Sequence, residues 1–388
     1  MTATLSEVDE NTTVVIVGAG VAGLTLGIFL LHSGIDCVVV EKRSREYVEQ
    51  RQRAGVIDTR AARMFRAHGL EDRVVGGVPT QPVLNFRIDG ETRPLALDAG
   101  DQGDGRFCPQ QVLVRNLIEV FLADGGDLRF SAEVSIENLD RPLVRYTGAA
   151  RTISCEFIAG CDGDRGVSRA AIPDLTRHTH EYGYAWLTVL AEVPANHQSM
   201  MALNHRGFAG QFARGPQASR FYLQCPLDST LEEWTDERIW DEIEARFGEP
   251  ATRGPIASTQ LVPLRSVVHS KMNHGRLYLL GDAAHIIPPM SAKGMNLALH
   301  DAELFANAVV RYRKENDSSL LDSYSATALR HVWNYQAFAM WWTELVHNAG
   351  DASYAGEFRR QAARAELERL FEPGPANRLL SEFIAGLN

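Results

Sequence analysis

The sequence predicts an α/β fold in three parts: a doubly wound parallel-sheet domain, an inserted antiparallel-sheet domain and a C-terminal helical region. The first part is indicated by a β-branched run at 14–17 that leads into a glycine-rich turn and an apolar helix. The second is indicated by uninterrupted strand patterns between 184 and 226, and the third by a helical pattern from 322 onward.

Residues 14–41 are expected to form a strand, a helix and a second strand that bind a dinucleotide. The turn reads Gly18-Ala19-Gly20-Val21-Ala22-Gly23. Gly18 permits the tight turn, Gly20 lets a pyrophosphate approach the backbone, and Gly23 lets helix and strand pack closely. Glu41 ends the second strand and can accept both hydroxyls of an adenosine ribose. The unit is therefore predicted to be Rossmann-like.

Composition restricts the classes of protein to consider. The 388 residues allow one large or two medium domains. The net charge of −10 argues against a nucleic-acid partner, and five cysteines without metal-ligand spacing favour a reduced, cytoplasmic setting without a metal. The uncharged stretch 11–35 could be read as a membrane span, but its three turn glycines argue against that reading, and no signal peptide is expected.

A basic segment follows the predicted nucleotide site. It contains Lys42, Arg43, Arg45, Arg51 and Arg53. It is either a solvated loop or a contact surface for nucleotide phosphates. Under the second interpretation charge-assisted hydrogen bonds to a 2′-phosphate would favour NADPH over NADH.

The middle of the chain is assigned from periodicity and turn residues. We expect helices at 59–68 and 110–122, a hairpin at 83–97 around Asp89-Gly90, and strands at 128–146 and 153–158. The last strand leads into Gly160-Cys161-Asp162-Gly163 and a predicted helix. This is either a second nucleotide-type loop or an ordinary turn.

The inserted sheet is expected to present two arginines on one face. Alternation along the hairpin 208–224 places Phe212 and Arg214 on one face, and Arg220, Tyr222 and Gln224 on one face of the partner strand. Inward arginines are unfavourable unless they meet an anion. A solvated sheet edge is the alternative.

The late part of the chain adds a third loop. A strand at 276–280 runs into Gly281-Asp282-Ala283-Ala284-His285, and a helix is expected from 291–296 to about 313. The N–H groups and dipole at its start suit an anionic region of a flavin. His285 and His300 suit packing or hydrogen bonding better than ligation. Aromatic faces at 333–345 indicate core or a subunit interface.

Three motifs together resemble the single-component FAD-dependent aromatic hydroxylases: GAGVAG with Glu41, GCDGDRG at 160–166, and GDAAHIIPPMSAKGMN at 281–296. Shorter matches at 53–56, 206–209, 234–238 and 263–266 extend the resemblance through nearly the whole chain. The resemblance implies an enzyme that consumes NAD(P)H and O₂ and hydroxylates an electron-rich aromatic ring through a flavin C4a-hydroperoxide. It also implies non-covalent FAD and a homodimer.

The resemblance assigns residues to each ligand. FAD would be held by Gly18, Gly20, Gly23, Glu41, Lys42, Arg53, Gln110, Asp162 and Asp282, with Pro289, Ala292, Gly294, Met295 and Asn296 by its isoalloxazine ring. NADPH would contact Lys42, Arg43, Tyr47, Arg51, Arg165 and Arg265. Arg214 would pair with a substrate carboxylate beside Tyr222, and Arg220 would steady the flavin, so the catalytic set is Arg214, Tyr222, Arg220 and Pro289.

The sequence departs from the family where substrate is bound and deprotonated. The two relay tyrosines fall at Met201 and at Phe383 or Ile384, and the relay histidine at Gln81. A carboxylate-binding serine is Phe212, and a threonine after the two prolines is Met290. The expected pocket is thus Met201, Phe212, Arg214, Tyr222 and Met290.

These departures indicate a different substrate. Met201 and Gln81 do not titrate near neutral pH, so the substrate is expected to be an aromatic acid activated by an amino group or several hydroxyls. N-hydroxylation, decarboxylative hydroxylation, halogenation and a non-catalytic FAD-binding role stay open. The expected bounds are 1–75, 100–178 and 265–320 for the FAD-binding domain, 76–99 and 179–264 for the substrate-binding domain, and 321–388 for the helical region.

Overall fold

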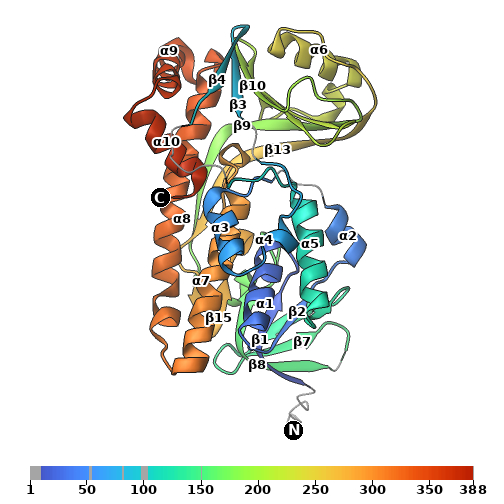
Figure 1. The fold of residues 1–388 in the computed structure, drawn as a ribbon, viewed down its shortest axis with the longest axis vertical. Helices are drawn as coiled ribbons and strands as arrows, with labels where there is room; N and C mark the ends of the chain where they lie inside the picture. Colours follow the sequence, from blue (N-terminus) through green and yellow to red (C-terminus); the bar gives the residue numbers. More distant parts are fainter. Residues whose placement is uncertain (1–9, 52–54, 81–82, 98–103, 150, 388) are drawn as a thin grey trace. The chain divides into compact units, whose positions relative to one another are not determined.

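A computed structural model describes residues 10–51, 55–80, 83–97, 104–149 and 151–387 (Figure 1). The chain forms two compact units. Unit 1 comprises 1–79, 104–179 and 267–336, and unit 2 comprises 80–103, 180–266 and 337–388. Among the described residues, no helix has the length and apolar character needed to cross a membrane.

Unit 1 is built on a mainly parallel sheet. Its order is β14-β15-β8-β1-β2-β5, and β15, β8, β1, β2 and β5 pair in parallel. These strands are β1 (Glu10–Val17), β2 (Cys37–Val40), β5 (Asp127–Arg129), β8 (Thr152–Gly160), β14 (Asn273–His274) and β15 (Leu277–Leu279). The single run expected at 128–146 is instead β5 followed by the hairpin β6 (Val134–Glu137) and β7 (Leu143–Tyr146).

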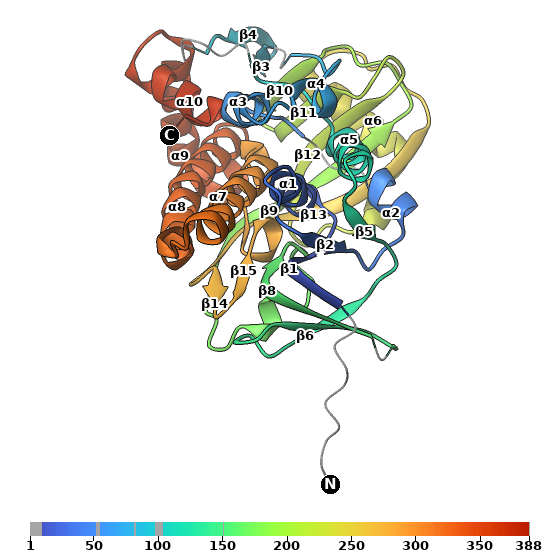
Figure 2. The same cartoon turned by 60° about the horizontal axis from the view of Figure 1, so that its bottom comes forward.

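Helix α1 (Val21–His32) is buried at every position from 21 to 30, which explains the uncharged stretch. It packs against α5 (Gln110–Ala123) and α7 (Gly294–Glu315), with these helices on either side of it in Figure 2. A Cβ at Gly27 would lie 3.0 Å from the Phe121 ring, so glycine permits the close approach of α1 and α5. The uncharged helix is thus a buried core element.

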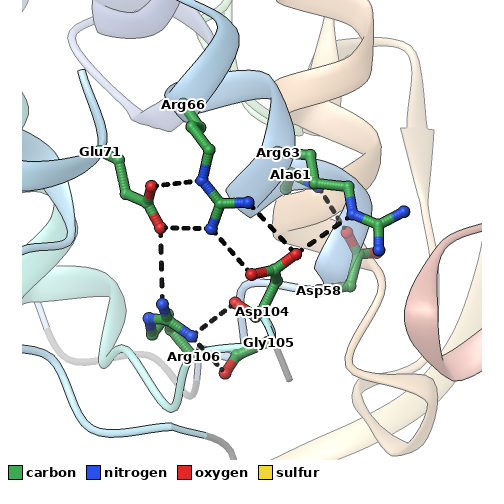
Figure 3. A network of polar contacts seen from close by, with 8 residues as sticks. All are labelled: Asp58, Ala61, Arg63, Arg66, Glu71, Asp104, Gly105 and Arg106. Carbon is green, nitrogen blue, oxygen red and sulfur yellow. Dashed lines mark hydrogen bonds and ion pairs between the residues drawn. The ribbon is translucent and has the colours of Figure 1, made fainter. Parts of the chain in front are cut away.

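A network of ion pairs joins two consecutive helices, α3 (Thr59–Ala67) and α4 (Glu71–Val74), to residues 104–106 (Figure 3). Arg66 binds Glu71 through Nε at 2.6 Å and Asp104 through Nη2 at 2.7 Å. Arg106 reaches Glu71 at 3.4 Å and donates to the carbonyl of Asp104 at 2.8 Å. Side-chain charge therefore fixes a segment that carries no regular secondary structure.

Unit 2 contains most of a second sheet, in the order β16-β13-β9-β12-β11-β10-β3-β4. β9 to β12 pair antiparallel with one another in the order β9-β12-β11-β10, β13 pairs antiparallel with β16 and β3 with β4, and β10 pairs in parallel with β3. The strands are β3 (Leu84–Ile88), β4 (Glu91–Leu95), β9 (Arg177–Ala191), β10 (Ser199–Asn204), β11 (Gly207–Ala213), β12 (Ser219–Pro226), β13 (Ile256–His269) and β16 (His285–Ile286). The hairpin predicted around Asp89-Gly90 is present as β3 and β4.

Helix α6 (Asp236–Phe247) covers one face of this sheet. Thr235 caps it, and Ile239, Trp240 and Phe247 pack into a core with residues of the strands. Arg246 is buried in the same helix, and its Nη1 donates to the carbonyls of Phe208 and Gln224 at 2.9 and 2.8 Å. Because side chains alternate along a strand, the residues next to those that contact α6 point to the opposite face of the sheet.

The C-terminal part consists of α8 (Ser319–Asn348), α9 (Ala352–Phe371) and α10 (Pro375–Ala385). Phe338, Trp342 and Leu345 are buried as expected, but Trp333 is 48% exposed and is not core. The prediction of a helix after the Cys161 loop was wrong. Only a single 3-10 turn, η1 (Arg169–Ala171), follows that loop, and the Pro173 region ends it.

Candidate active site

The three sequence motifs meet at the carboxyl edge of the unit 1 sheet. β1 runs into Gly18, β8 into Cys161 and β15 toward Gly281, and the three strands are neighbours. A Cβ on Gly18 would lie 2.4 Å from the carbonyl oxygen of Cys161, and one on Gly281 would lie 3.1 Å from Ala298. Ligands bind at this edge of open α/β sheets, so the motifs are correctly assembled for a nucleotide.

The glycine turn leaves the start of α1 open for a phosphate group. Gly20 is the N-cap, no side chain caps the helix, and a Cβ on Gly20 would meet nothing within 4 Å. In contrast, a Cβ on Gly23 would lie 2.0 Å from the carbonyl oxygen of Gly18. Unsatisfied N–H groups and the positive end of the helix dipole therefore face open space, which fits a pyrophosphate.

Glu41 has a further task that the sequence did not reveal. Its Oε2 accepts the N–H of Ala19 at 2.9 Å, and its Oε1 accepts the N–H of Arg43 at 2.8 Å. The carboxylate thus ties the glycine turn to the end of β2. A carboxylate has about four acceptor positions, so hydrogen bonds from ribose hydroxyls remain compatible with these contacts.

Asp162 closes its own loop. Its Oδ2 accepts the N–H and the Oγ–H of Ser168 at 2.9 and 3.0 Å, and a Cβ on Gly166 would lie 1.9 Å from Asp162 Cγ. Burial raises the pKa of Asp162, and the hydrogen bonds from Ser168 oppose that rise. The described contacts give Asp162 a loop-shaping role, while Asp282 lies half-buried at the start of the next loop.

A buried histidine–aspartate pair holds the loop after β15 to α7. His285 Nε2 lies 2.7 Å from Asp301 Oδ2, and both side chains are almost inaccessible. The same oxygen accepts the N–H of Gly281 at 2.8 Å. Burial alone would lower the pKa of His285, but the charge and hydrogen bond of Asp301 raise it overall. His285 is therefore a hydrogen-bonding residue, as the sequence predicted.

A second buried ion pair was missed by sequence reasoning. Lys293 Nζ lies 2.7 Å from Asp58 Oδ2, with side-chain exposures of 3% and 4%. Burial lowers the pKa of Lys293, and Asp58 counteracts that effect. Asn296 strengthens the link by donating to Val56 O at 2.9 Å and accepting from Asp58 N at 3.1 Å. The loop of 289–296 is thereby fixed to the start of α3.

This anchoring leaves part of the loop accessible. Pro289 and Ala292 are exposed and Gly294 is half-buried, whereas Met290 and Met295 are buried. Ala292 has φ 53°, and no side chain caps the start of α7 at Lys293. An accessible backbone next to uncapped N–H groups fits a flat, partly anionic ring system.

The described basic residues after Glu41 lie on and around a short helix: Arg45 is its first residue, Lys42 and Arg43 precede it, and Arg51 follows it. Helix α2 (Arg45–Gln50) begins at Ser44, which caps it, and Arg45 pairs with Glu49 at 2.7 Å. Lys42, Arg43, Tyr47 and Arg51 are exposed, as is Arg165 in the Asp162 loop. Arg53 and Gln81 lie outside the described residues, and Gln110 is the first residue of α5.

The face of the unit 2 sheet opposite α6 carries four of the five predicted substrate residues, while Met290 belongs to the 289–296 loop of unit 1. In the strand register Phe212 faces Arg220 and Gly210 faces Tyr222, while Met201 pairs with Gly210 on the other side. Arg214 follows Phe212 with the same parity, and Arg265 lies on β13. Burial lowers the pKa of Arg220, and Tyr222 opposes this effect. The positive charge of Arg214 lowers the pKa of Arg220 further, so the two guanidinium groups repel each other.

Apolar side chains occupy the two positions where the resemblance implies relay tyrosines, Met201 and Phe383 or Ile384. Met201 is 6% exposed. Phe383 stacks on Phe338 with ring centroids 4.6 Å apart and an angle of 3°. Phe212 contacts Tyr222 edge to face at 5.8 Å. On the sheet face, Met201, Phe212 and Tyr222 therefore form an apolar and aromatic part that suits an aromatic ring, whereas Phe338 and Phe383 belong to helices α8 and α10.

Comparison with known proteins agrees with this geometry. The sequence matches the family model described as "FAD binding domain" over residues 11–339. It is 34% identical over 389 residues to the p-hydroxybenzoate hydroxylase of Acinetobacter baylyi, covering 97% of this chain and 96% of that protein. It is 28% identical to a 3-(3-hydroxy-phenyl)propionate/3-hydroxycinnamic acid hydroxylase of Mycolicibacterium gilvum, covering 82% of this chain and 57% of that protein.

Solved structures show the same fold. The p-nitrophenol 4-monooxygenase of Pseudomonas putida DLL-E4 superposes with a TM-score of 0.83 at 19% identity, covering 97% of this chain and 99% of that one. The chain therefore belongs to the FAD-dependent aromatic hydroxylases, a family of flavin-dependent aromatic monooxygenases.

Proposed function

We propose that the protein uses FAD and NADPH to hydroxylate an electron-rich aromatic carboxylic acid. The observation that carries this proposal is the pair Arg214 and Arg220 on the same sheet face as Phe212 and Tyr222. Two partly buried cations beside aromatic rings favour a ligand that is flat and anionic at one end. A carboxylate would meet the guanidinium of Arg214, and the ring would lie against the aromatic side chains.

The residues of unit 1 support binding of FAD. The open start of α1 at Gly20 would hold the pyrophosphate, Glu41 the ribose, and the accessible backbone at Pro289 and Ala292 the isoalloxazine ring. FAD supplies the redox and oxygen chemistry when bound, and the protein supplies binding, orientation and exclusion of water. The uncapped start of α7 would favour negative charge at the ring.

NADPH is the proposed reductant. Lys42, Arg43 and Arg51 are exposed next to the nucleotide edge, and Arg165 is exposed on the neighbouring loop. Charge-assisted hydrogen bonds to a 2′-phosphate contribute about 1.5–3 kcal/mol each, which would favour NADPH over NADH. A second copy of the chain is the proposed partner in a homodimer.

An amino- or polyhydroxy-substituted ring is the proposed substrate class. The phenol of a simple hydroxybenzoate reacts well only after losing its proton, and Met201 and Phe383 cannot remove it. An amino substituent donates electrons without deprotonation, so it suits an apolar end of the face.

The test is a screen of amino-, hydroxy- and nitrogen-heterocyclic aromatic acids for stimulation of NADPH oxidation, with product identification by mass. We expect an acid that accelerates oxidation and gains one oxygen atom. With that acid, Arg214→Ala should raise KM at least tenfold, about 1.4 kcal/mol. The control is Arg206→Ala, an exposed arginine in the turn between β10 and β11 that pairs with Glu242, which should change KM less than twofold.

Other outcomes would replace the proposal. A halogenated, N-hydroxylated or decarboxylated product would assign a different reaction to the same cofactor. Binding of FAD without stimulation by any acid would indicate a non-catalytic protein. An unchanged KM in Arg214→Ala would remove the carboxylate contact.

A further inference from the structure

The sheet face that carries Tyr222 and the two arginines also carries a buried tryptophan, Trp186 of β9, next to Tyr222. The ring centroids of Trp186 and Tyr222 are 4.8 Å apart at an angle of 45°. Phe208 stacks with the same indole at 5.2 Å and 18°. Trp186 therefore supports the tyrosine that the proposed substrate would contact.

His347, in the last turn of α8, fixes this indole. Trp186 Nε1–H donates to His347 Nε2 at 2.7 Å, and His347 Nδ1 lies 2.7 Å from the carbonyl oxygen of Thr343. An indole nitrogen can only donate, so Nε2 must be the acceptor and Nδ1 must carry the proton. Burial lowers the pKa of His347 to about 3, although the hydrogen bond to Thr343 raises it. The ring is therefore neutral at physiological pH.

Packing against the sheet fixes the end of α8 in a position from which His347 can accept the indole N–H. The His347 ring stacks on Tyr184 of β9 at 4.5 Å and 18°. A Cβ at Gly350 would lie 3.1 Å from the carbonyl carbon of Gly207, the first residue of β11. Such a close approach leaves the histidine little freedom, because both its helix and its ring are packed against the sheet.

We propose that His347 is a positioning residue of the substrate face: by accepting the indole N–H of Trp186, it sets the plane of that ring and thereby the place of Tyr222. The hydrogen bond also occupies the only polar atom of the indole, so the ring offers carbon alone to a bound aromatic acid. This inference rests on the proposed function of the face. Without an acceptor, the buried N–H would be unsatisfied, and the indole would turn to find another partner.

The first test needs no ligand. FAD-bound protein labelled with 3-fluorotyrosine gives a ¹⁹F resonance for Tyr222, assigned by its loss in Tyr222→Phe. We expect His347→Phe to shift this resonance, and His347→Gln, whose amide oxygen can replace Nε2 as acceptor, to restore it. An unmoved resonance in folded His347→Phe overturns the proposal.

The second test measures affinity. Benzoate, 4-aminobenzoate and 3,4-dihydroxybenzoate are titrated into FAD-bound protein and followed by flavin absorbance. For the tightest of these, His347→Phe should raise Kd at least fivefold and His347→Gln less than twofold. Trp186→Phe should raise Kd as well, and adding His347→Phe to it should have less than a twofold further effect, since the histidine acts through the indole.

Matched controls separate positioning from loss of stability. Trp240→Phe removes a buried indole that packs edge to face on Phe221 on the opposite side of the same sheet, and it should change neither the resonance nor Kd. If His347→Phe does not fold, Trp186→Phe decides: an unmoved Tyr222 resonance and an unchanged Kd overturn the proposal. Failure of the proposed function would look different, because no acid would bind wild-type protein while His347→Phe still shifted Tyr222.

Discussion

Lys293 shows how one residue of the late motif acts on a helix far earlier in the chain. Its ammonium group is buried at 2.7 Å from Asp58, the N-cap of α3. Lys293→Met would leave a buried carboxylate without its cation, which destabilises proteins by about 3–5 kcal/mol. We expect that loss in urea unfolding of the FAD-bound protein. Adding Asp58→Asn should recover much of it because the amide is neutral and still caps α3, and a double variant no more stable than Lys293→Met would contradict this account.

Gly210 controls the aromatic part of the substrate face. A Cβ there would lie 3.2 Å from the rings of both Phe208 and Phe212 and 3.5 Å from Tyr222. Gly210→Ala must therefore displace at least one ring. We expect KM for the aromatic acid to rise at least fivefold, about 1 kcal/mol, with unchanged FAD content. The control Gly374→Ala, at an extended and open backbone position, should leave KM unaltered.

The positions of site residues could be predicted where they depend only on spacing along the local sequence. The glycines of 18–23, Glu41 and the alternation that puts Arg220 and Tyr222 on one face all follow from spacing along one or two strands. Trp186 with His347 was not predictable, because the partners lie 161 positions apart and neither has a distinctive neighbourhood. Lys293 is recognisable in the sequence as a charged residue within the mainly apolar segment 283–299. Nothing in that segment identifies Asp58 as its partner.

At the scale of elements, burial explains both the successes and the errors. Helix α1 was identified despite its lack of charge because the glycine turn fixed its start, and its uniform burial removes the membrane interpretation. The helix expected after Cys161 failed because Asp162 turns the chain back onto Ser168 and leaves only η1. A side chain that satisfies its own loop competes with helix formation.

The network around α3 and α4 makes a prediction about pH. Hydrogen bonds from Arg66 lower the pKa of Asp104 below its ordinary 3.8, and Arg63 lowers it further. Burial has the opposite effect but does not outweigh the two arginines. Stability from a lowered carboxyl pKa is fully present above that value and disappears as pH falls through the native pKa. Asp104→Asn should therefore lower unfolding free energy by about 0.5–1 kcal/mol at pH 7, and by progressively less as pH falls below 3.8.

Urea unfolding between pH 3 and 7 measures this difference. Asp228→Asn, an exposed aspartate in unit 2, provides a control that should change stability little at any pH. A difference between wild type and Asp104→Asn that persisted unchanged at pH 3 would show that the network does not depend on the carboxylate charge.

The whole molecule consists of two units with separate cores, and their fold class followed from the sequence because each is built from a recognisable pattern. The parallel pairing of β10 with β3 did not follow, since it joins strands that are distant in sequence. Nor did the division of α8, whose residues 319–336 cluster with unit 1 and 337–348 with unit 2. Long-range pairing is decided by tertiary packing, which local periodicity does not encode.

We expect the substrate ring to react without a chain of protein groups that removes its proton, because its own substituents supply the electron density needed for hydroxylation. Where the resemblance implies the two relay tyrosines, the chain has Met201, which is buried, and Phe383 stacked on Phe338, or the adjacent Ile384. None of these side chains titrates, so they cannot transmit a proton at neutral pH. The oxygen-transfer step, isolated by stopped flow after mixing with oxygen, should therefore vary less than about threefold, or ~0.6 kcal/mol, between pH 6 and 9. Met201→Tyr should not accelerate it, because an amino-substituted ring needs no base. A steep rise with an apparent pKa near that of a substrate phenol would show that ionisation controls the step and that another group serves as the base.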